Sequence, residues 1–234
     1  MVFSGALMEG LCLSYDIAKG TKNVIFSNNP TNPDLYKLDY KNLAIFVRDY
    51  LRIIKENPNL EISIKEFKFP NDSIYGMNLV REGSDVIDIY LNSELNECWS
   101  RFVICKELIQ LYLDSGKLVK NEKSYPPNEI IEQIKEATVA QQYLNKIDKD
   151  YKFSTGFSPE ALAYIIVTDL FFPLENKRLV KKIGTDVIDK KKHNFTHYDL
   201  ASLFKTPEHI TRFYRAYIEE ASLVYLEDME KNFA

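Results

Sequence analysis

The hydrophobic and polar positions follow a helical period in several stretches of the chain. Between residues 40 and 54, apolar side chains recur every three or four positions, and Asn57 and Pro58 end the pattern. Residues 99–113 are apolar on nearly every side, which is typical of a helix buried in a core. The same reasoning predicts further helices at residues 126–144, 161–172, 197–204 and 207–229.

Two other stretches alternate between apolar and polar residues, which is the period of a half-buried strand. The first covers residues 60–69 and ends at Pro70, and the second covers residues 86–91. Residues 81–85 between them have the composition of a turn. These features predict a small antiparallel sheet, so that the fold class is α+β.

The N-terminal part of the chain shows neither period clearly. Residues 16–39 are rich in Asn, Pro, Thr and Ser, which is typical of loops. We therefore expect residues 1–40 to form an irregular segment.

Composition and charge narrow the class of protein. The chain has 234 residues, of which 45% are hydrophobic and 27% charged, as in soluble globular proteins. Its net charge of −4 provides no general attraction to nucleic acid, so a nucleic-acid role needs a local basic patch. Cys12, Cys98 and Cys105 lack the spacing of metal ligands, and no apolar run is long enough to cross a membrane. We expect a cytoplasmic protein without a membrane partner.

Three later segments carry the candidate chemistry. Residues 101–111 read RFVICKELIQL, residues 160–173 read EALAYIIVTDLFFP, and residues 199–213 read DLASLFKTPEHITRF. In this order and spacing, the chain resembles the ImmA/IrrE (DUF955) family of metallopeptidases. The corresponding family motifs are R-F-x-x-A-H-E-x-G-H, E-A-N-x-F-A-x-x-L-L-M-P and L-A-x-x-F-x-V-S-x-x-x-[IV]-x-x-R-L. The resemblance extends over residues 40–220.

The resemblance implies a zinc site that this chain has lost. In the intact motif, two His four residues apart and a carboxylate from a second helix bind zinc, and a Glu beside the first His is the general base. Here the two His positions hold Lys106 and Gln110, and the acidic position holds Leu162. Only the general-base position is kept, as Glu107. An ammonium repels a divalent cation and a carboxamide is a poor zinc ligand, so we expect no metal cofactor.

The sequence allows more than one interpretation of these positions. Residues 99–113 also fit a core helix that happens to contain Lys-Glu. The Lys106 ammonium either replaces the zinc charge and pairs with nearby acids, or extends to solvent. Because Lys106 and Glu107 are sequential, we do not expect them to face each other on the helix. A register slip on the second helix would bring Glu160 or Asp169 toward the site.

A basic run at residues 177–192 precedes the C-terminal helices. Such a run is usually a solvated face, but beside a helix-turn-helix-like unit it would contact phosphates. His193 and His197 have a ligand-like spacing, for which we favour capping or surface roles over metal binding. If this unit binds DNA, the residues expected to face the groove are His209, Thr211, Arg212 and Arg215.

Together these features predict an α+β fold with a zincin-like helical core. Residues 41–175 would form the metallopeptidase-like domain, and residues 176–234 a helical, helix-turn-helix-like extension packed on it. The resemblance implies a catalytically inactive relative that binds a protein or peptide in a phage, mobile-element or stress-response setting. One alternative is an atypical metallo-endopeptidase that cleaves a repressor-type protein. Another is a DNA-associated regulator that acts through the C-terminal helices.

Overall fold

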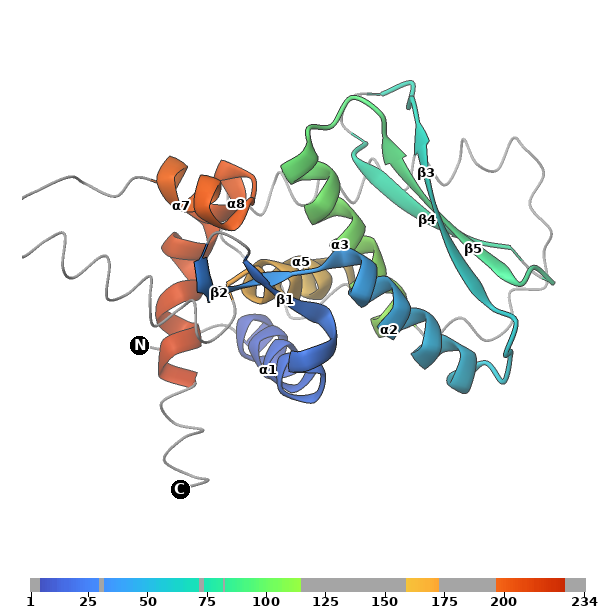
Figure 1. The fold of residues 1–234 in the computed structure, drawn as a ribbon, viewed down its shortest axis with the longest axis horizontal. Helices are drawn as coiled ribbons and strands as arrows, with labels where there is room; N and C mark the ends of the chain where they lie inside the picture. The colour runs from blue at the N-terminus through green and yellow to red at the C-terminus, as the bar shows by residue number, and fades with distance from the viewer. Residues whose placement is uncertain are drawn as a thin grey trace, which may run out of the picture. The chain divides into compact units, whose positions relative to one another are not determined.

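The chain has a mixed α+β fold (Figure 1). The computed structural model describes residues 5–29, 32–71, 74–81, 83–114, 159–172 and 197–225. The chain divides into two compact units, which are described separately below. The first unit contains residues 1–42 and 164–234, and the second contains residues 43–163. The domain boundaries expected from the sequence, 1–40, 41–175 and 176–234, stay a prediction.

The first unit begins with helix α1 (Gly5–Ile25) and a two-stranded antiparallel sheet of β1 (Phe26–Asn29) and β2 (Asn32–Leu38). The prediction of an irregular segment over residues 1–40 is therefore wrong. Although the composition is polar, buried side chains recur along α1 every three or four residues. They are Leu7, Leu11, Ser14, Ile17, Thr21 and Ile25.

The rest of the first unit is helical. It comprises the end of α5 (Pro159–Leu170), then α7 (His197–Phe204), α8 (Glu208–Phe213) and the π-helical segment η1 (Tyr214–Ile218), and the helix continues to Tyr225. These elements confirm the helices predicted at 161–172 and 197–204 and most of the one predicted at 207–229. Helix α1 packs closely on α5, since a Cβ atom at Gly10 would lie 2.6 Å from Cγ2 of Ile165.

The π-helical segment keeps the last helix facing the core. Ile210, Tyr214, Ile218 and Ser222 are all buried, at intervals of four residues. In a regular α-helix each interval of four would turn the buried side by about 40°. The wider π-turn offsets part of that drift, so these four side chains stay on the buried side.

The second unit contains most of α2 (Tyr40–Ile54), three strands and α3 (Glu97–Asp114). The helices predicted at 40–54 and 99–113 are confirmed. The strands β3 (Glu61–Phe67), β4 (Gly76–Val80) and β5 (Val86–Asn92) form a sheet of order β3-β5-β4. Strand β5 is parallel to β3 and antiparallel to β4. The prediction of an antiparallel sheet is therefore wrong, because β4 was not recognised between the two predicted strands.

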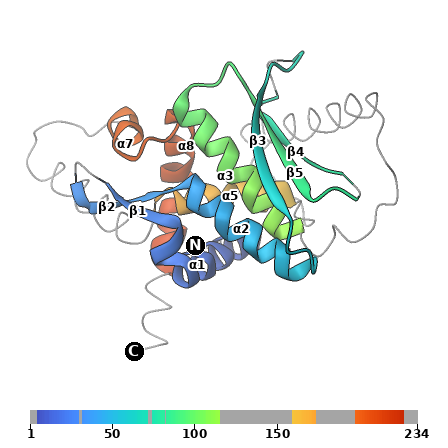
Figure 2. The same cartoon turned by 45° about the vertical axis from the view of Figure 1, so that its right-hand side comes forward.

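Helix α3 lies against one face of this sheet and contacts β4 and β5 (Figure 2). Gly76 allows the close approach, since a Cβ atom there would lie 2.4 Å from Cγ1 of Val103. The register pairs Gly76 with Leu91 and Asn78 with Ile89, so these four residues share the face toward α3.

Some predictions fall on parts of the chain that the structure does not describe. The helix predicted at 126–144, the basic run at 177–192 and His193 lie outside the described residues. Within the described ranges, no helix is long and apolar enough to cross a membrane.

Candidate functional site

The centre of the candidate site lies on the buried middle of α3. Lys106 is only 8% exposed and Glu107 only 2%. The Lys106 Nζ atom lies 2.8 Å from Glu107 Oε1. Lys106 therefore does not extend to solvent, and the expectation that it would not meet Glu107 is wrong. A lysine has a flexible four-carbon stem, so its ammonium can reach the neighbouring carboxylate, and the two charges attract strongly away from water.

Asn78 on β4 completes the group. Its Nδ2 atom donates a hydrogen bond of 2.9 Å to Glu107 Oε2. The other oxygen, Oε1, contacts the Lys106 ammonium as an ion pair without the alignment of a hydrogen bond. We call these three residues the Lys106–Glu107–Asn78 cluster. Asn78 was missed from the sequence because β4 was not predicted, and no local pattern links residue 78 to residue 107.

The other two degenerate ligand positions do not restore a metal site. Gln110 follows Lys106 by one helical turn and is half-buried, and Leu162 on α5 is buried. A cation, a carboxamide and an aliphatic side chain do not fit zinc, which prefers thiolate, imidazole and carboxylate donors. In the part of the chain that the structure describes, no three His, Cys, Asp or Glu side chains gather as a metal-binding group.

Asp169 belongs to the core of the first unit. Its Oδ2 atom accepts a hydrogen bond of 2.7 Å from Ser14 on α1, and its Oδ1 atom accepts one of 3.0 Å from Ser222 on the last helix. Asp169 is 4% exposed, and its carboxyl group joins three helices of this unit. Both carboxylate oxygens are thus engaged by hydroxyl groups, which favours a structural role for Asp169. Nothing is described of the Glu160 side chain.

Thr211, one of the residues predicted to contact DNA, lies buried at the turn between α7 and α8. Thr211 is fully buried, and its Oγ1 atom lies 2.8 Å from Thr206 Oγ1 and 3.3 Å from the carbonyl oxygen of Pro207. Thr211 therefore fixes the turn from inside and does not face a groove.

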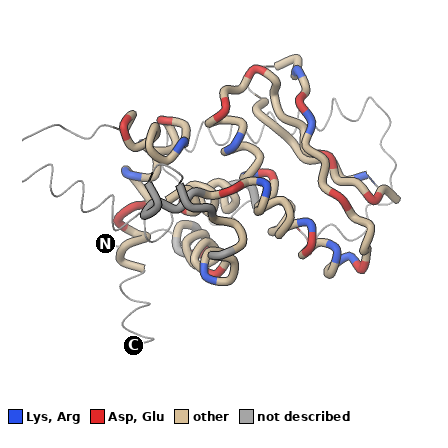
Figure 3. Tube along the Cα trace, viewed as in Figure 1, with Lys and Arg blue, Asp and Glu red and all other residues tan. Residues whose placement is uncertain are grey.

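The other three candidates for DNA contact, His209, Arg212 and Arg215, are exposed. Arg212 pairs with Glu208 at 2.5 Å, and Arg215 lies 3.6 Å from Glu219. Acidic as well as basic positions occur along α7, α8 and the helix that follows (Figure 3). Phosphate binding would have to compete with these carboxylates, which weakens the case for DNA contact.

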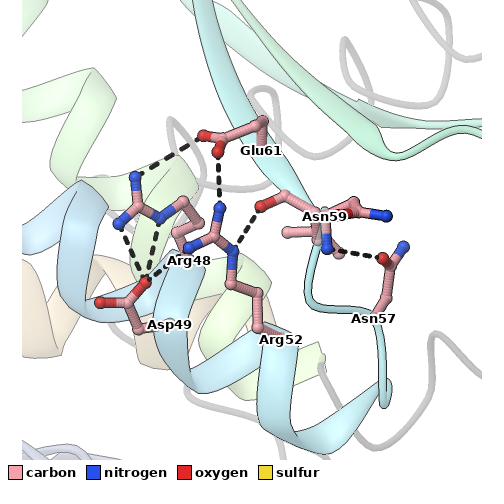
Figure 4. Close-up of polar contacts among 7 residues, drawn as sticks. Arg48, Asp49, Arg52, Asn57, Asn59 and Glu61 are labelled. Carbon is pink, nitrogen blue, oxygen red and sulfur yellow. Dashed lines mark hydrogen bonds and ion pairs between the residues drawn. The ribbon is translucent and has the colours of Figure 1, made fainter.

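A surface cluster of charges joins the end of α2 to the start of β3 (Figure 4). Glu61 accepts from Arg52 at 2.5 Å and lies 3.6 Å from Arg48, and both guanidinium groups also contact Asp49. Arg52 donates a further hydrogen bond of 2.8 Å to the carbonyl oxygen of Leu60. Two cations and two anions balance here, so the cluster fits a structural connection better than an anion site.

The sheet face away from α3 holds a second buried carboxylate. Asp88 is 3% exposed, with Lys65 Nζ at 2.7 Å and Arg81 Nη2 at 3.5 Å. The hydroxyl of Tyr90 donates to Asp88 Oδ2 at 3.3 Å. Lys65 belongs to β3, Arg81 follows β4 directly and Tyr90 belongs to β5. These contacts therefore hold the three strands together.

One hydroxyl group in the first unit is buried without a partner. The Tyr214 hydroxyl makes no hydrogen bond with any residue that the structure describes, and its ring stacks on Phe172 with centroids 4.0 Å apart. Burial, with the nearby charges of Asp169 and Glu219, holds the pKa of Tyr214 well above its usual range. The group therefore stays protonated and serves packing.

Comparison of the chain with protein-family models, with curated proteins and with solved structures found no match.

Proposed function

We propose that this chain is a catalytically inactive relative of the ImmA/IrrE metallopeptidases that acts in the cytoplasm as a protein- or peptide-binding regulator. The observation that supports the proposal is the buried ion pair of Lys106 and Glu107. These residues stand where the family has its first zinc ligand and its general base.

The chemistry of this pair argues against hydrolysis. In metallopeptidase hydrolysis, the general base must reach a water molecule that the metal has made more acidic. Glu107 is instead almost fully buried, and its two oxygens contact an ammonium and a carboxamide. The ammonium of Lys106 also supplies a positive charge inside the protein, which disfavours a divalent cation at the same place. A scaffold of this kind keeps its surfaces for binding after it has lost the reaction.

The two alternatives have less support. An atypical metallo-endopeptidase needs a new set of ligands, and among the described residues no such set is present. A DNA-associated regulator needs accessible cations, but Arg212 and Arg215 each have a carboxylate partner on the same helix. We therefore propose that the chain acts by binding a protein. The resemblance implies that it does so as a phage, mobile-element or stress-response regulator.

The test uses purified repressor-type proteins as candidate partners. Each is mixed with the purified chain, with and without added zinc, and followed by size-exclusion chromatography and denaturing gels. The proposal expects a complex in which both chains stay intact, with zinc having no effect. Zinc-dependent cleavage of a partner would establish the peptidase alternative instead. Intact partners that never co-elute would contradict the binding role.

A matched variant separates binding from chemistry. Lys106→Met with Glu107→Gln removes both charges and keeps the size of both side chains. If the complex depends on the scaffold alone, its affinity should stay within about threefold, a difference of well under 1 kcal/mol.

A further inference from the structure

The Lys106–Glu107–Asn78 cluster brings an amine and a carboxamide to one carboxyl group. Lys106 Nζ lies 2.8 Å from Glu107 Oε1, and Asn78 Nδ2 lies 2.9 Å from Oε2. Both nitrogen atoms therefore contact the same carboxyl group, Nζ at Oε1 and Nδ2 at Oε2. One comes from α3 and the other from β4, which lie side by side in Figures 1 and 2.

The surroundings favour a reaction between these groups. The side chain of Lys106 is 10% exposed and that of Glu107 is 3% exposed, so little water reaches the cluster. The close approach of Gly76 to Val103 fixes β4 against α3 only two residues from Asn78. Holding two reactants in a dry, fixed arrangement removes much of the entropic cost of their reaction.

We propose that Lys106 and Asn78 form an intramolecular amide cross-link, with Glu107 as the proton carrier. Glu107 takes one proton from the ammonium, and the neutral amine attacks Cγ of Asn78. Glu107 passes that proton to Nδ2, the Cγ–Nδ2 bond breaks, and the nitrogen leaves as ammonia. The new Nζ–Cγ amide keeps one of the three ammonium protons, and Glu107 retains the last one.

The reaction needs no oxidant and no cofactor, and it removes charge from the interior. Before it, a buried ammonium faces a buried carboxylate, and both have lost most of their hydration. After it, the amide and the carboxylic acid are neutral. Neutral, hydrogen-bonded groups are easier to bury than ions, so the low-polarity surroundings favour the product.

The cross-link would tie β4 to α3 covalently and close the chain between them. A closed loop restricts the unfolded chain, which raises the stability of the second unit. This inference goes beyond the proposed function and does not depend on it, since an unreacted ion pair would block the zinc position as well.

Intact-mass spectrometry of the purified full-length chain tests the proposal. The wild type is expected to weigh less than its sequence by one molecule of ammonia, and digestion should release a peptide pair joined through residues 78 and 106. Lys106→Met, Glu107→Gln and Asn78→Ala should each show the full mass of their own sequences. Asn59→Ala, on the surface away from the cluster, should keep the mass loss.

The wild-type chain alone decides the question, even if a variant folds poorly. A wild type with its full sequence mass, both fresh and after prolonged incubation under native conditions, overturns the cross-link. So does a mass loss that peptide mapping places at any other pair of residues. A mass loss that persists in Glu107→Gln would overturn the role of Glu107 as proton carrier.

Discussion

The buried charges of Lys106 and Glu107 can be removed one at a time or together. Lys106→Met keeps the length of the side chain and strands the Glu107 carboxylate. Glu107→Gln keeps an acceptor for Asn78 and removes the carboxylate that pairs with the Lys106 ammonium. The double variant removes both charges and retains the hydrogen bond to Asn78. Comparison of the three variants therefore measures the cost of breaking this buried ion pair.

The geometry sets the size of the effect. At the 2.8 Å between Lys106 Nζ and Glu107 Oε1, two unit charges attract by about 6 kcal/mol at an effective dielectric constant of about 20. Removing one partner of a buried pair typically costs about 3–5 kcal/mol, because the other charge is left without compensation. The double variant strands no charge. We expect it to be more stable than either single variant by roughly 3 kcal/mol.

Urea denaturation followed by circular dichroism provides the assay, with thermal unfolding as a second measure. For a chain of this length, that difference corresponds to roughly 6–12 °C in Tm. None of the three variants can form the cross-link, so their order does not depend on it. The matched control is Arg48→Met with Glu61→Gln at the exposed cluster, where charge removal should cost less than about 1 kcal/mol. A double variant no more stable than both singles would refute the buried ion pair.

Three further predictions concern single substitutions. Gly76→Ala should lower the free energy of unfolding in urea by about 1–3 kcal/mol, because no space exists for the methyl group. The control Gly20→Ala, where nothing lies within 4 Å of the added Cβ, should raise it by about 0.5–1 kcal/mol. Equal effects would contradict the close packing of α3 on β4. Ser222→Ala should cost about 1.5–3 kcal/mol through the lost bond to a buried carboxylate, while exposed Ser202→Ala on α7 should change the unfolding free energy by less than about 0.5 kcal/mol. Tyr214→Phe should leave neutral-pH stability unchanged or raise it by about 1 kcal/mol, since it removes an unpaired hydroxyl. Because the pKa of Tyr214 is raised in the folded state, its contribution to folding stability is complete below about pH 10 and is lost as the pH rises further. The Phe variant should therefore lose less stability than the wild type in alkaline titrations. Identical profiles of stability against pH would count against the burial of the hydroxyl.

The helices were predictable where apolar residues are concentrated. α2, α3, α5 and α7 each lie within a residue or two of their predicted ranges, because α2 and α7 have a regular apolar face and α3 and α5 are buried on nearly every side. α1 was missed because buried Ser14 and Thr21 contribute to its inner face, and polar residues there conceal the helical period.

The sheet illustrates what local patterns leave out. β4 has only five residues, Gly76–Val80, and two of them are Gly and Asn, which are uncommon in strands. Without β4, the two longer strands were expected to form an antiparallel sheet, although they are parallel neighbours. Strand direction is decided by the whole connection between two strands, which the pattern of either one does not contain.

The contacts of the candidate residues were not predictable from the sequence. The resemblance singled out Lys106 and Glu107, and their role stays a prediction. Their ion pair was missed because the rule for neighbouring helix positions neglects the reach of a lysine stem. Asn78 was missed because it meets Glu107 only through the packing of β4 on α3. Thr211 was misplaced because its bond to Thr206 turns it inward.

Zinc binding tests the central claim most directly. The wild-type chain and the variant Lys106→His, Gln110→His, Leu162→Glu are each titrated with zinc by isothermal calorimetry. The metal content of both proteins is then measured after dialysis against a mild chelator. That variant places zinc-ligand types at the three positions that the resemblance implies, so it should bind zinc, although weakly if the groups that orient the His rings are absent. The account predicts no stoichiometric zinc in the wild type. One equivalent of zinc that survives dialysis in the wild type would contradict it.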